Sequence, residues 1–486
     1  MSDGATDAPG PTLPYAARDV LEGGALDAVA VEGAHGNGEL TRVFDALGIA
    51  GPFRRTSPWE LEDPRGRHLV HAGGYAALPF GEGPPALVEA ARAYLAGFRT
   101  PAFAQQAASE ARAALAANLV ALLAHGAPRH ADDRVLFSNS GAEAIEIALK
   151  LLRASKPDAP WILTFRGGYH GKTMGALSIT PTEEYQAAFR PLLPGVRTLP
   201  YGDLDAVERE LMVVGADQVA GLVVEPVQGE GGVVTPPDGF LAGLQDLRER
   251  YGLRIVADEI QTGLGRTGHW FASVAAGLDP DVVTLAKPLS GGLVPIGATI
   301  ARPDLMQAML PGFSSRRHSS TFAGNGLAMA VALSALETLV EGRYDLRARE
   351  AGARGRARLQ ALAERRPGLV REVRSAGLLH ALVLHDPVAP GLLGGRPALA
   401  RLLASGLGVR SLHLAGVHAI VSLAASGVVR LTPALDMPEA LQATLWDRVD
   451  AFADAHPQAW RLAASAGPAR LARLARIATR GGPRSR

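Results

Sequence analysis

Across residues 134–301, short apolar, β-rich runs alternate with amphipathic segments, and this alternation sets the fold. The runs are RVLFS, WILTF, VRTLPY, VAGLVVEP, LRIVAD, VVTLAK and PIGATIA. Between them lie AEAIEIALKLLRAS, LDAVERELMVV and GFLAGLQDLRERYG, whose apolar residues recur at helical spacing. Continuous apolar strands separated by helices predict an α/β fold with a mostly parallel sheet covered on both faces. Ligands of such sheets bind beyond the carboxyl ends of the strands, so the residues after each run are candidates for a site.

Composition excludes several classes of function. The 486 residues carry a formal net charge of +1, so we expect neither a nucleic-acid nor a membrane partner. The chain has no cysteine, which removes disulfides and cysteine-ligated metals, and we expect no metal. The opening MSDGATDAPGPTLP is unlike a secretory signal, and the most apolar stretch, residues 412–429, carries two histidines. We therefore expect a soluble, cytoplasmic protein.

A lysine and an aspartate stand at the ends of two of the apolar runs. The chain has only four lysines against 45 arginines, and one of them, Lys287, ends VVTLAK. Asp258 ends LRIVAD, 29 residues earlier. A buried ion pair is one explanation. The other is chemistry that needs an amine, since a desolvated lysine forms a Schiff base with an aldehyde and a guanidinium cannot. A carboxylate facing it could keep a pyridine nitrogen protonated.

A pyridine aldehyde with a phosphate also needs an anion cradle. The stretch LFSNSGAEAIEIALK predicts a strand, a turn at Ser140 and Gly141, and a helix beginning near Ala142. A helix N-terminus offers unpaired N–H groups and the positive end of a dipole, and glycine allows close approach of the backbone. Ser140 is equally well explained as an ordinary N-cap.

Seven motifs together carry a resemblance to a known family. They are SNSGAEAIEIALKLLR, GGYHGKTMGALS, EPVQGEGG, VADEIQTGLGRTG, TLAKPLSGG, HSSTFAGN and VVRLTPAL. In this order and spacing, from about Trp59 to Val449, the chain resembles the class III aminotransferases of the ornithine, acetylornithine, 4-aminobutyrate and putrescine type. The resemblance implies the fold type I of enzymes that use pyridoxal 5′-phosphate (PLP). It also implies a homodimer whose active sites are shared between subunits.

The resemblance also implies a division of the chain into four parts. Residues 1–84 would form an N-terminal arm and part of a small domain, and residues 85–335 a large PLP-binding domain with the mostly parallel sheet. Residues 336–467 would complete the small α+β domain, which is thus built from both chain ends. Residues 468–486 would be a basic tail in which arginines alternate with leucines, either a docked helix with a solvated face or a site for an anionic partner.

Residue by residue, the resemblance implies the following contacts with the cofactor. Lys287 would be the Schiff-base lysine and carry the proton, Asp258 would pair with the pyridine nitrogen, and Gln261 would hydrogen-bond the ring oxygen. Ser140, Gly141 and Ala142 would hold the phosphate, Tyr169 would stack on the ring, and Thr321 would reach the partner subunit's phosphate. Two alternatives stay open: Tyr169 as a core aromatic and His170 as a structural histidine.

Substrate contacts are implied at three further positions. Arg430, after the run VVRL, would bind a substrate α-carboxylate, although an arginine in so arginine-rich a chain can also be a surface residue. Glu230 would pair with Arg430 while an ω-amine donor is bound and release it for a 2-oxo acid. Lys172 stands where many relatives have an arginine that contacts the distal carboxylate of 2-oxoglutarate. Glu225 would lie behind these residues.

These features predict transamination between an ω-amine donor and a 2-oxo acid acceptor, 2-oxoglutarate. YHGKTMGALSIT, FRPLLPGV and LVPIGATIA are most similar to the putrescine aminotransferase branch, which favours a diamine or ω-amino acid. The stretch PFGEGPP departs from the family pattern, so no role is carried over to nearby Tyr75. Two alternatives remain: a PLP-dependent racemase or epimerase, and a PLP-binding protein without catalysis.

Overall fold

The computed structural model describes residues 14–23, 26–97, 107–393 and 395–480. The first thirteen residues of the predicted arm and the last six of the predicted tail lie outside this range. The chain divides into two compact units, one of residues 1–53 with 468–486 and the other of residues 54–467. Each unit is described separately below.

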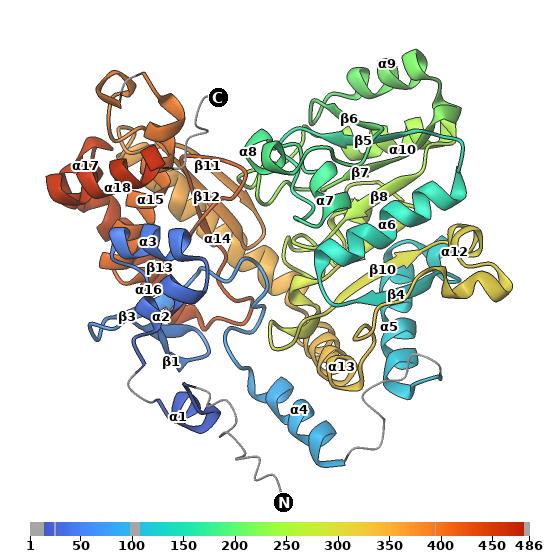
Figure 1. Ribbon diagram of the computed structural model, residues 1–486, viewed down its shortest axis with the longest axis horizontal. Helices are drawn as coiled ribbons and strands as arrows, with labels where there is room; N and C mark the ends of the chain where they lie inside the picture. The colour runs from blue at the N-terminus through green and yellow to red at the C-terminus, as the bar shows by residue number, and fades with distance from the viewer. Residues whose placement is uncertain (1–13, 24–25, 98–106, 394, 481–486) are drawn as a thin grey trace, which may run out of the picture. The chain divides into compact units, whose positions relative to one another are not determined.

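The larger unit contains a seven-stranded sheet in the order β4-β10-β9-β8-β7-β5-β6 (Figure 1). Its strands are β4 (Arg134–Ser138), β5 (Trp161–Phe165), β6 (Val196–Leu199), β7 (Val219–Val224), β8 (Ile255–Asp258), β9 (Val282–Leu285) and β10 (Gly297–Ala301). Strands β5 to β9 pair in parallel, whereas β10 pairs antiparallel with both β4 and β9. Each of the seven apolar runs therefore contains a strand, and the prediction of a mostly parallel sheet is confirmed.

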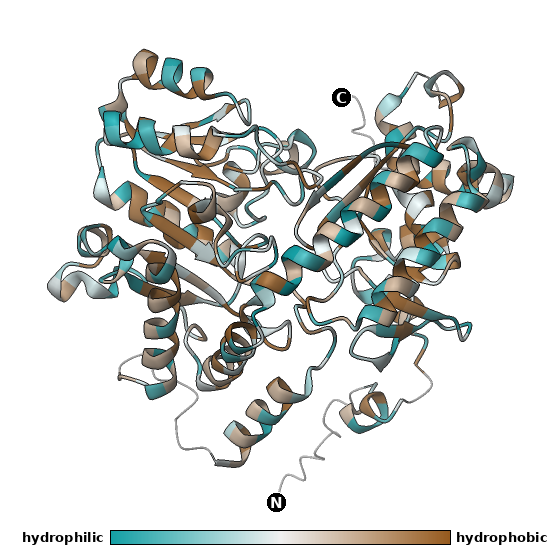
Figure 2. Ribbon diagram, turned by 180° about the vertical axis from the view of Figure 1, so that it is seen from behind, coloured by the Kyte–Doolittle hydropathy of each residue, from teal (hydrophilic) through white to brown (hydrophobic). Residues whose placement is uncertain are grey.

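Helices cover both faces of this sheet. The predicted amphipathic segments form α6 (Gly141–Ser155), α9 (Leu204–Val214) and α10 (Phe240–Tyr251). On β5, Ile162 packs in one cluster with residues of α6, and the next residue, Leu163, packs in another with residues of α9 and α10. Successive side chains of a strand point to opposite faces, so α6 lies on one face and α9 and α10 lie on the other. Hydropathy colouring shows the strands of this sheet as mainly hydrophobic (Figure 2).

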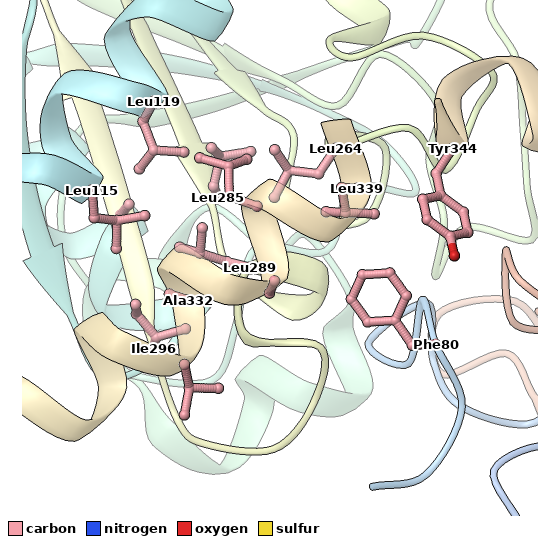
Figure 3. Packing of buried hydrophobic residues seen from close by; sticks show 14 of the residues in the cluster. Phe80, Leu115, Leu119, Leu264, Leu285, Leu289, Ile296, Ala332, Leu339 and Tyr344 are labelled. Carbon is pink, nitrogen blue, oxygen red and sulfur yellow. The ribbon is translucent and has the colours of Figure 1, made fainter. Parts of the chain in front are cut away.

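A third cluster packs around the end of β9. It joins residues of α5 (Glu110–Gly126), α13 (Gly326–Glu341) and the 3₁₀ turn η4 (Lys287–Ser290). Leu285 and Leu289, on either side of Lys287, are fully buried in it (Figure 3). The backbone that carries Lys287 is therefore fixed by the packing of its neighbours.

Two smaller four-stranded sheets complete this unit, in the orders β1-β2-β3-β13 and β11-β12-β15-β14. Their strands are β1 (Arg54–Ser57), β2 (Glu60–Glu62), β3 (His68–His71), β11 (Val370–Ala376), β12 (Leu379–Leu384), β13 (Val417–His418), β14 (Ile420–Val421) and β15 (Val428–Leu431). The other helices of the unit are α4 (Pro85–Gly97), α7 (Met174–Ser178), α8 (Glu183–Gln186), α11 (Ala272–Ala275), α12 (Pro303–Met309), α14 (Tyr344–Arg365), α15 (Pro397–Leu414), α16 (Glu439–Ala455) and α17 (Trp460–Ala466). Since β3 pairs with β13, segments from both ends of the unit share one sheet.

The smaller unit is helical. It comprises α1 (Ala17–Leu21), α2 (Ala28–His35), α3 (Gly38–Leu47) and, from the other end of the chain, α18 (Pro468–Arg480). Helix α18 packs against α3, where Arg470 Nε donates to the carbonyl of Ala46 at 2.8 Å and Arg473 pairs with Asp45. The basic segment is thus a docked helix.

Within the described ranges, no helix is both long enough and apolar enough to cross a bilayer. The predicted boundaries at residues 84/85 and 335/336 fall inside the larger unit and stay a proposal.

Candidate active site

Asp258 and Lys287 lie at the same edge of the large sheet. Strands β8 and β9 are parallel neighbours, and Asp258, the last residue of β8, is opposite Thr284 of β9. Lys287 begins η4 two residues after β9 ends. The hydroxyl of Thr284 lies 3.3 Å from Asp258 Oδ1 and donates to it. Asp258 and Lys287 therefore lie at the carboxyl ends of two adjacent parallel strands.

Lys287 is a half-buried residue whose amine has no close partner among the described residues. Burial lowers its pKa from the ordinary value, and this effect outweighs the opposing charges of Glu230 and Asp258. Among the described residues, Lys287 forms no ion pair or hydrogen bond, and Asp258 pairs with His170 instead. The buried Lys287–Asp258 ion pair is therefore not what this structure contains. A desolvated amine of this kind is suited to act as a nucleophile and a base.

His170 supports Asp258 from behind. His170 Nδ1 lies 2.7 Å from Asp258 Oδ2, and both side chains are almost fully buried. Burial opposes protonation of this imidazole, but the hydrogen bond and charge of Asp258 raise its pKa above the usual value. The other Asp258 oxygen accepts from the N–H of Ile260 at 3.1 Å. The expectation of a structural histidine missed this contact, because residues 88 apart in sequence give no local signal.

Glu225 is the second buried acid in this layer. It accepts from the N–H of Tyr169 at 3.0 Å, and burial raises its pKa to about 8, against the nearby charge of His170. Its position next to the backbone of Tyr169 and His170 agrees with the predicted supporting role.

Helix α6 presents its N-terminus to the same place. Ser140 is the N-cap, and its hydroxyl accepts from the N–H of Glu143 at 3.2 Å, so the N-cap interpretation of its side chain holds. A Cβ added to Gly141 would lie 2.9 Å from Ile260 and 3.4 Å from Ala286. Since Ile260 and Ala286 are near neighbours of Asp258 and Lys287 in sequence, the predicted cradle, acid and lysine converge. Among the described residues, no acceptor is found for the N–H groups of Gly141 and Ala142.

Arg430 and Glu230 form a closed, buried pair. Arg430, in β15, is fully buried, and its Nη2 lies 2.6 Å from Glu230 Oε1. The alternative of a surface arginine is therefore excluded. Gln261 bridges the pair, donating to Glu230 and accepting from Arg430, each at 3.0 Å. In the described part of the chain, Arg430 Nε has no partner, which leaves one donor for a further ligand. The predicted contact of Gln261 with the cofactor ring remains untested.

The other predicted residues surround this pair. Tyr169 is half-buried, and burial together with the charge of Glu230 raises its pKa, so it is not an ordinary core aromatic. Lys172 Nζ lies 4.0 Å from the centre of the Tyr185 ring, and Arg430 lies 5.7 Å from the centre of the Tyr75 ring. Thr321 is exposed, and its neighbour Ser320 accepts from the Asn139 amide at 2.9 Å. The contact of Thr321 with a partner subunit stays a prediction.

Comparison with known proteins identifies the family. The family model described as "Aminotransferase class-III" matches residues 52–445, and the chain belongs to this family. It is 39% identical over 330 residues to the aminotransferase PigE of a Serratia species, a match covering 67% of this chain and 37% of PigE. It is 43% identical over 265 residues to the acetylornithine aminotransferase of Methanopyrus kandleri, covering 54% of this chain and 64% of that protein. Both matches span less than two thirds of the relative's own length.

Solved structures agree with this assignment. An (S)-enantioselective ω-transaminase from Thermomicrobium roseum superposes with a TM-score of 0.76 at 28% identity, covering 88% of this chain and 98% of that chain. The ornithine aminotransferase from Toxoplasma gondii, whose structure contains PLP, gives a TM-score of 0.72 at 28% identity, with 85% and 91% covered. The PLP-dependent transferase fold predicted from the sequence is confirmed.

PLP is the cofactor of this family, and the site fits it. Lys287 would supply a desolvated amine for its aldehyde, and Asp258 would supply a buried acid for its ring nitrogen. The close packing at Gly141 and the unpaired N–H groups of α6 suit its phosphate. When bound, PLP supplies an aldehyde that takes up an amino group and a ring that withdraws electrons from the adjoining carbon.

Proposed function

We propose that this protein is a PLP-dependent transaminase that moves an amino group from an ω-amine donor to a 2-oxo acid. The proposal rests on two features of one site: the lowered pKa of Lys287 and the closed Glu230–Arg430 ion pair. A transaminase needs an amine such as that of Lys287 to move a proton. It needs a pair such as Glu230–Arg430 because the donor and the acceptor bind at the same site in turn and differ in charge.

In the proposed reaction, the residues have the following roles. Lys287 Nζ takes the proton from the amine-bearing carbon of the donor, which requires the uncharged amine that burial favours. Asp258, held by His170, keeps a proton at the ring nitrogen by its negative charge. The backbone N–H groups at the start of α6, at Gly141, would hold the phosphate of the cofactor.

Glu230 acts as the gate between the two substrates. While it neutralises Arg430, a donor that has no carboxylate at this end meets no uncompensated cation. When a 2-oxo acid enters, its α-carboxylate takes the place of Glu230 on the Arg430 guanidinium, where two parallel hydrogen bonds are available. The unpaired Nε of Arg430 supports this exchange.

We infer a diamine or ω-amino acid as donor, putrescine-like in preference, and 2-oxoglutarate as acceptor. The motif similarity favours the donor class, and Lys172 beside the pocket favours an acceptor with a second carboxylate. The ornithine and acetylornithine aminotransferases and the ω-transaminase among the relatives support this range of donors. A homodimer in which Thr321 completes the neighbouring site, and a cytoplasmic location, belong to the same proposal.

A donor panel tests this function. Putrescine, cadaverine, ornithine, N-acetylornithine, lysine, 4-aminobutyrate and β-alanine are each paired with 2-oxoglutarate and with pyruvate, and formation of glutamate or alanine is measured. We expect the highest kcat/KM for a diamine with 2-oxoglutarate. Equal rates for donors with and without a carboxylate would argue against the diamine, and the absence of any amino-acid product would argue against transamination.

A further inference from the structure

We propose that Tyr185 is a positioning residue that fixes Lys172 as the second carboxylate-binding group of the pocket, so that the pair selects dicarboxylic over monocarboxylic oxo acids. This inference rests on the proposed function and adds to it the residue that sets the class of acceptor. No motif pointed to Tyr185, which lies in the short helix α8.

The contact that carries the inference is a cation–π interaction. Lys172 Nζ sits 4.0 Å from the centre of the Tyr185 ring, although the lysine as a whole is exposed. In the described part of the chain, Lys172 makes no ion pair with a carboxylate, so its ammonium group is available to an anionic ligand. Such a contact favours one position of a flexible side chain over the others.

The Tyr185 ring is itself held on two sides. Its hydroxyl donates to the carbonyl of Leu423, which lies more than two hundred residues further along the chain. Its ring meets that of Tyr169 edge-to-face, with 6.4 Å between centroids and 81° between planes. Burial, with smaller effects of nearby acids, raises the pKa of Tyr185 to about 12, so the phenol stays protonated and can donate. Lys172 therefore rests on a fixed platform.

Leu423 links Tyr185 to Glu230. The N–H of Leu423 donates to Glu230 Oε2 at 3.0 Å, while its carbonyl accepts from Tyr185. The backbone of this one residue thus joins the ring under Lys172 to the carboxylate that covers Arg430. An oxo acid that binds Arg430 through its α-carboxylate would find a second cation at the other end of this series of contacts.

Pre-positioning matters here because the cation is a lysine. An arginine would offer a rigid fork of donors, whereas an ammonium on a four-carbon stem must be restrained to contribute the same selectivity. Restraint before binding lowers the entropic cost of recognition. Tyr185 supplies that restraint.

The test measures binding rather than turnover. Glutarate and valerate have equal carbon chains and differ by one carboxylate, and neither can be transaminated. Their dissociation constants for the full-length, PLP-loaded protein are measured by titration calorimetry. We expect the wild type to prefer glutarate by about tenfold, which corresponds to about 1.4 kcal/mol. Tyr185→Leu should reduce this preference three- to fivefold. Tyr185→Phe keeps the ring and its edge contact with Tyr169 but loses the bond to Leu423, so it should lose less of the preference than Tyr185→Leu does.

Lys172→Met is the control that removes the cation from the Lys172–Tyr185 contact. This exposed substitution should remove the preference for glutarate, and adding Tyr185→Leu to it should change nothing further. The inference is overturned if the wild type does not prefer glutarate, if Tyr185→Leu keeps the full preference, or if Tyr185→Phe loses as much as Tyr185→Leu. It is also overturned if Tyr185→Leu has an equal effect with and without Lys172. Because no turnover is involved, these results are independent of the donor panel, which tests the proposed transamination separately.

Discussion

At the scale of single residues, the site depends on where charge is allowed and where it is suppressed. Lys287 is desolvated and has its pKa lowered, whereas Asp258 is kept beside an imidazole whose pKa is raised. Arg430 is buried but compensated by Glu230. The lowered pKa of Lys287 and the paired charges of Asp258 and Arg430 suit the proposed chemistry, and each group can be tested by substitution.

Replacing Lys287 with alanine should lower turnover by about a thousandfold or more, since positioned proton transfer alone contributes about 10²–10⁴-fold. Lys287→Arg should be equally inactive because a guanidinium cannot lose its charge. Borohydride reduction of the PLP-loaded protein followed by peptide mapping should label residue 287. Labelling at another lysine, or a fully active alanine variant, would contradict the assignment.

Glu225 predicts a dependence of stability on pH. Burial raises its pKa from 4.5 to about 8. At a pH between these two values, Glu225 is therefore protonated in the folded protein but ionised in the unfolded chain, so folding takes up a proton. The stabilising contribution of the protonated form is complete below about pH 4.5 and is lost as the pH rises through about 8. Glu225→Gln needs no proton and should not lose stability in this window.

Urea unfolding at pH 5.5, 6.5 and 7.5 measures this effect. The free energy of unfolding of Glu225→Gln, minus that of the wild type, should increase with pH by up to about 1.4 kcal/mol per unit. Glu89→Gln, on an exposed position of α4, serves as the control and should give a constant difference. A constant difference for Glu225→Gln as well would show that this carboxyl is ionised in the folded protein.

At the scale of elements, the N-terminus of α6 is placed by close packing against the segments that follow β8 and β9. A Cβ at Gly141 would lie 2.9 Å from Ile260 and 3.4 Å from Ala286, so a methyl group fits there only if the Ile260 side chain shifts. The helix start, the acid and the lysine are therefore held in one arrangement by van der Waals contact, independently of the cofactor.

Gly141→Ala should accordingly cost about 1–3 kcal/mol of stability through overpacking. It should also weaken retention of PLP, which is measured by dialysis and absorbance. Gly33→Ala, in the last turn of α2 with open space around it, is the control. It should be neutral or stabilising by up to about 1 kcal/mol. Equal behaviour of the two variants would contradict the close-packing argument.

At the scale of the whole molecule, the chain contains two compact units, and the smaller one joins its two ends. Helix α18 packs against α3, with Leu474 buried and the arginines directed to backbone and carboxylate acceptors. Exposed ion pairs of this kind contribute little, typically below about 1 kcal/mol, so apolar packing should dominate the stability of this unit.

Leu474→Ala should therefore destabilise the smaller unit by about 2–4 kcal/mol. Hydrogen exchange should accelerate in α3 and remain unchanged in the strands of the large sheet. Arg473→Gln, which removes only the half-exposed ion pair with Asp45, should leave exchange in α3 almost unchanged. Faster exchange throughout the larger unit would show that the two units unfold together.

The amino-acid sequence alone predicted the strands of the large sheet, its main covering helices and the family to which the chain belongs. Short apolar runs that alternate with amphipathic segments favour buried strands, and a lysine at the end of one run in an arginine-rich chain is consistent with chemistry that needs an amine. Parallel pairing of β8 and β9 then brings Asp258 and Lys287 together at one edge, because parallel strands end on the same side.

Only the tertiary structure decided which partner each charged group takes. His170 on Asp258, Gln261 between Glu230 and Arg430, and Tyr185 beneath Lys172 are contacts between residues far apart in sequence. Such contacts depend on how loops fold over the sheet edge, and no periodicity encodes them. The docking of α18 on α3 has the same cause: an amphipathic pattern predicts a helix but does not name the surface that will bury it.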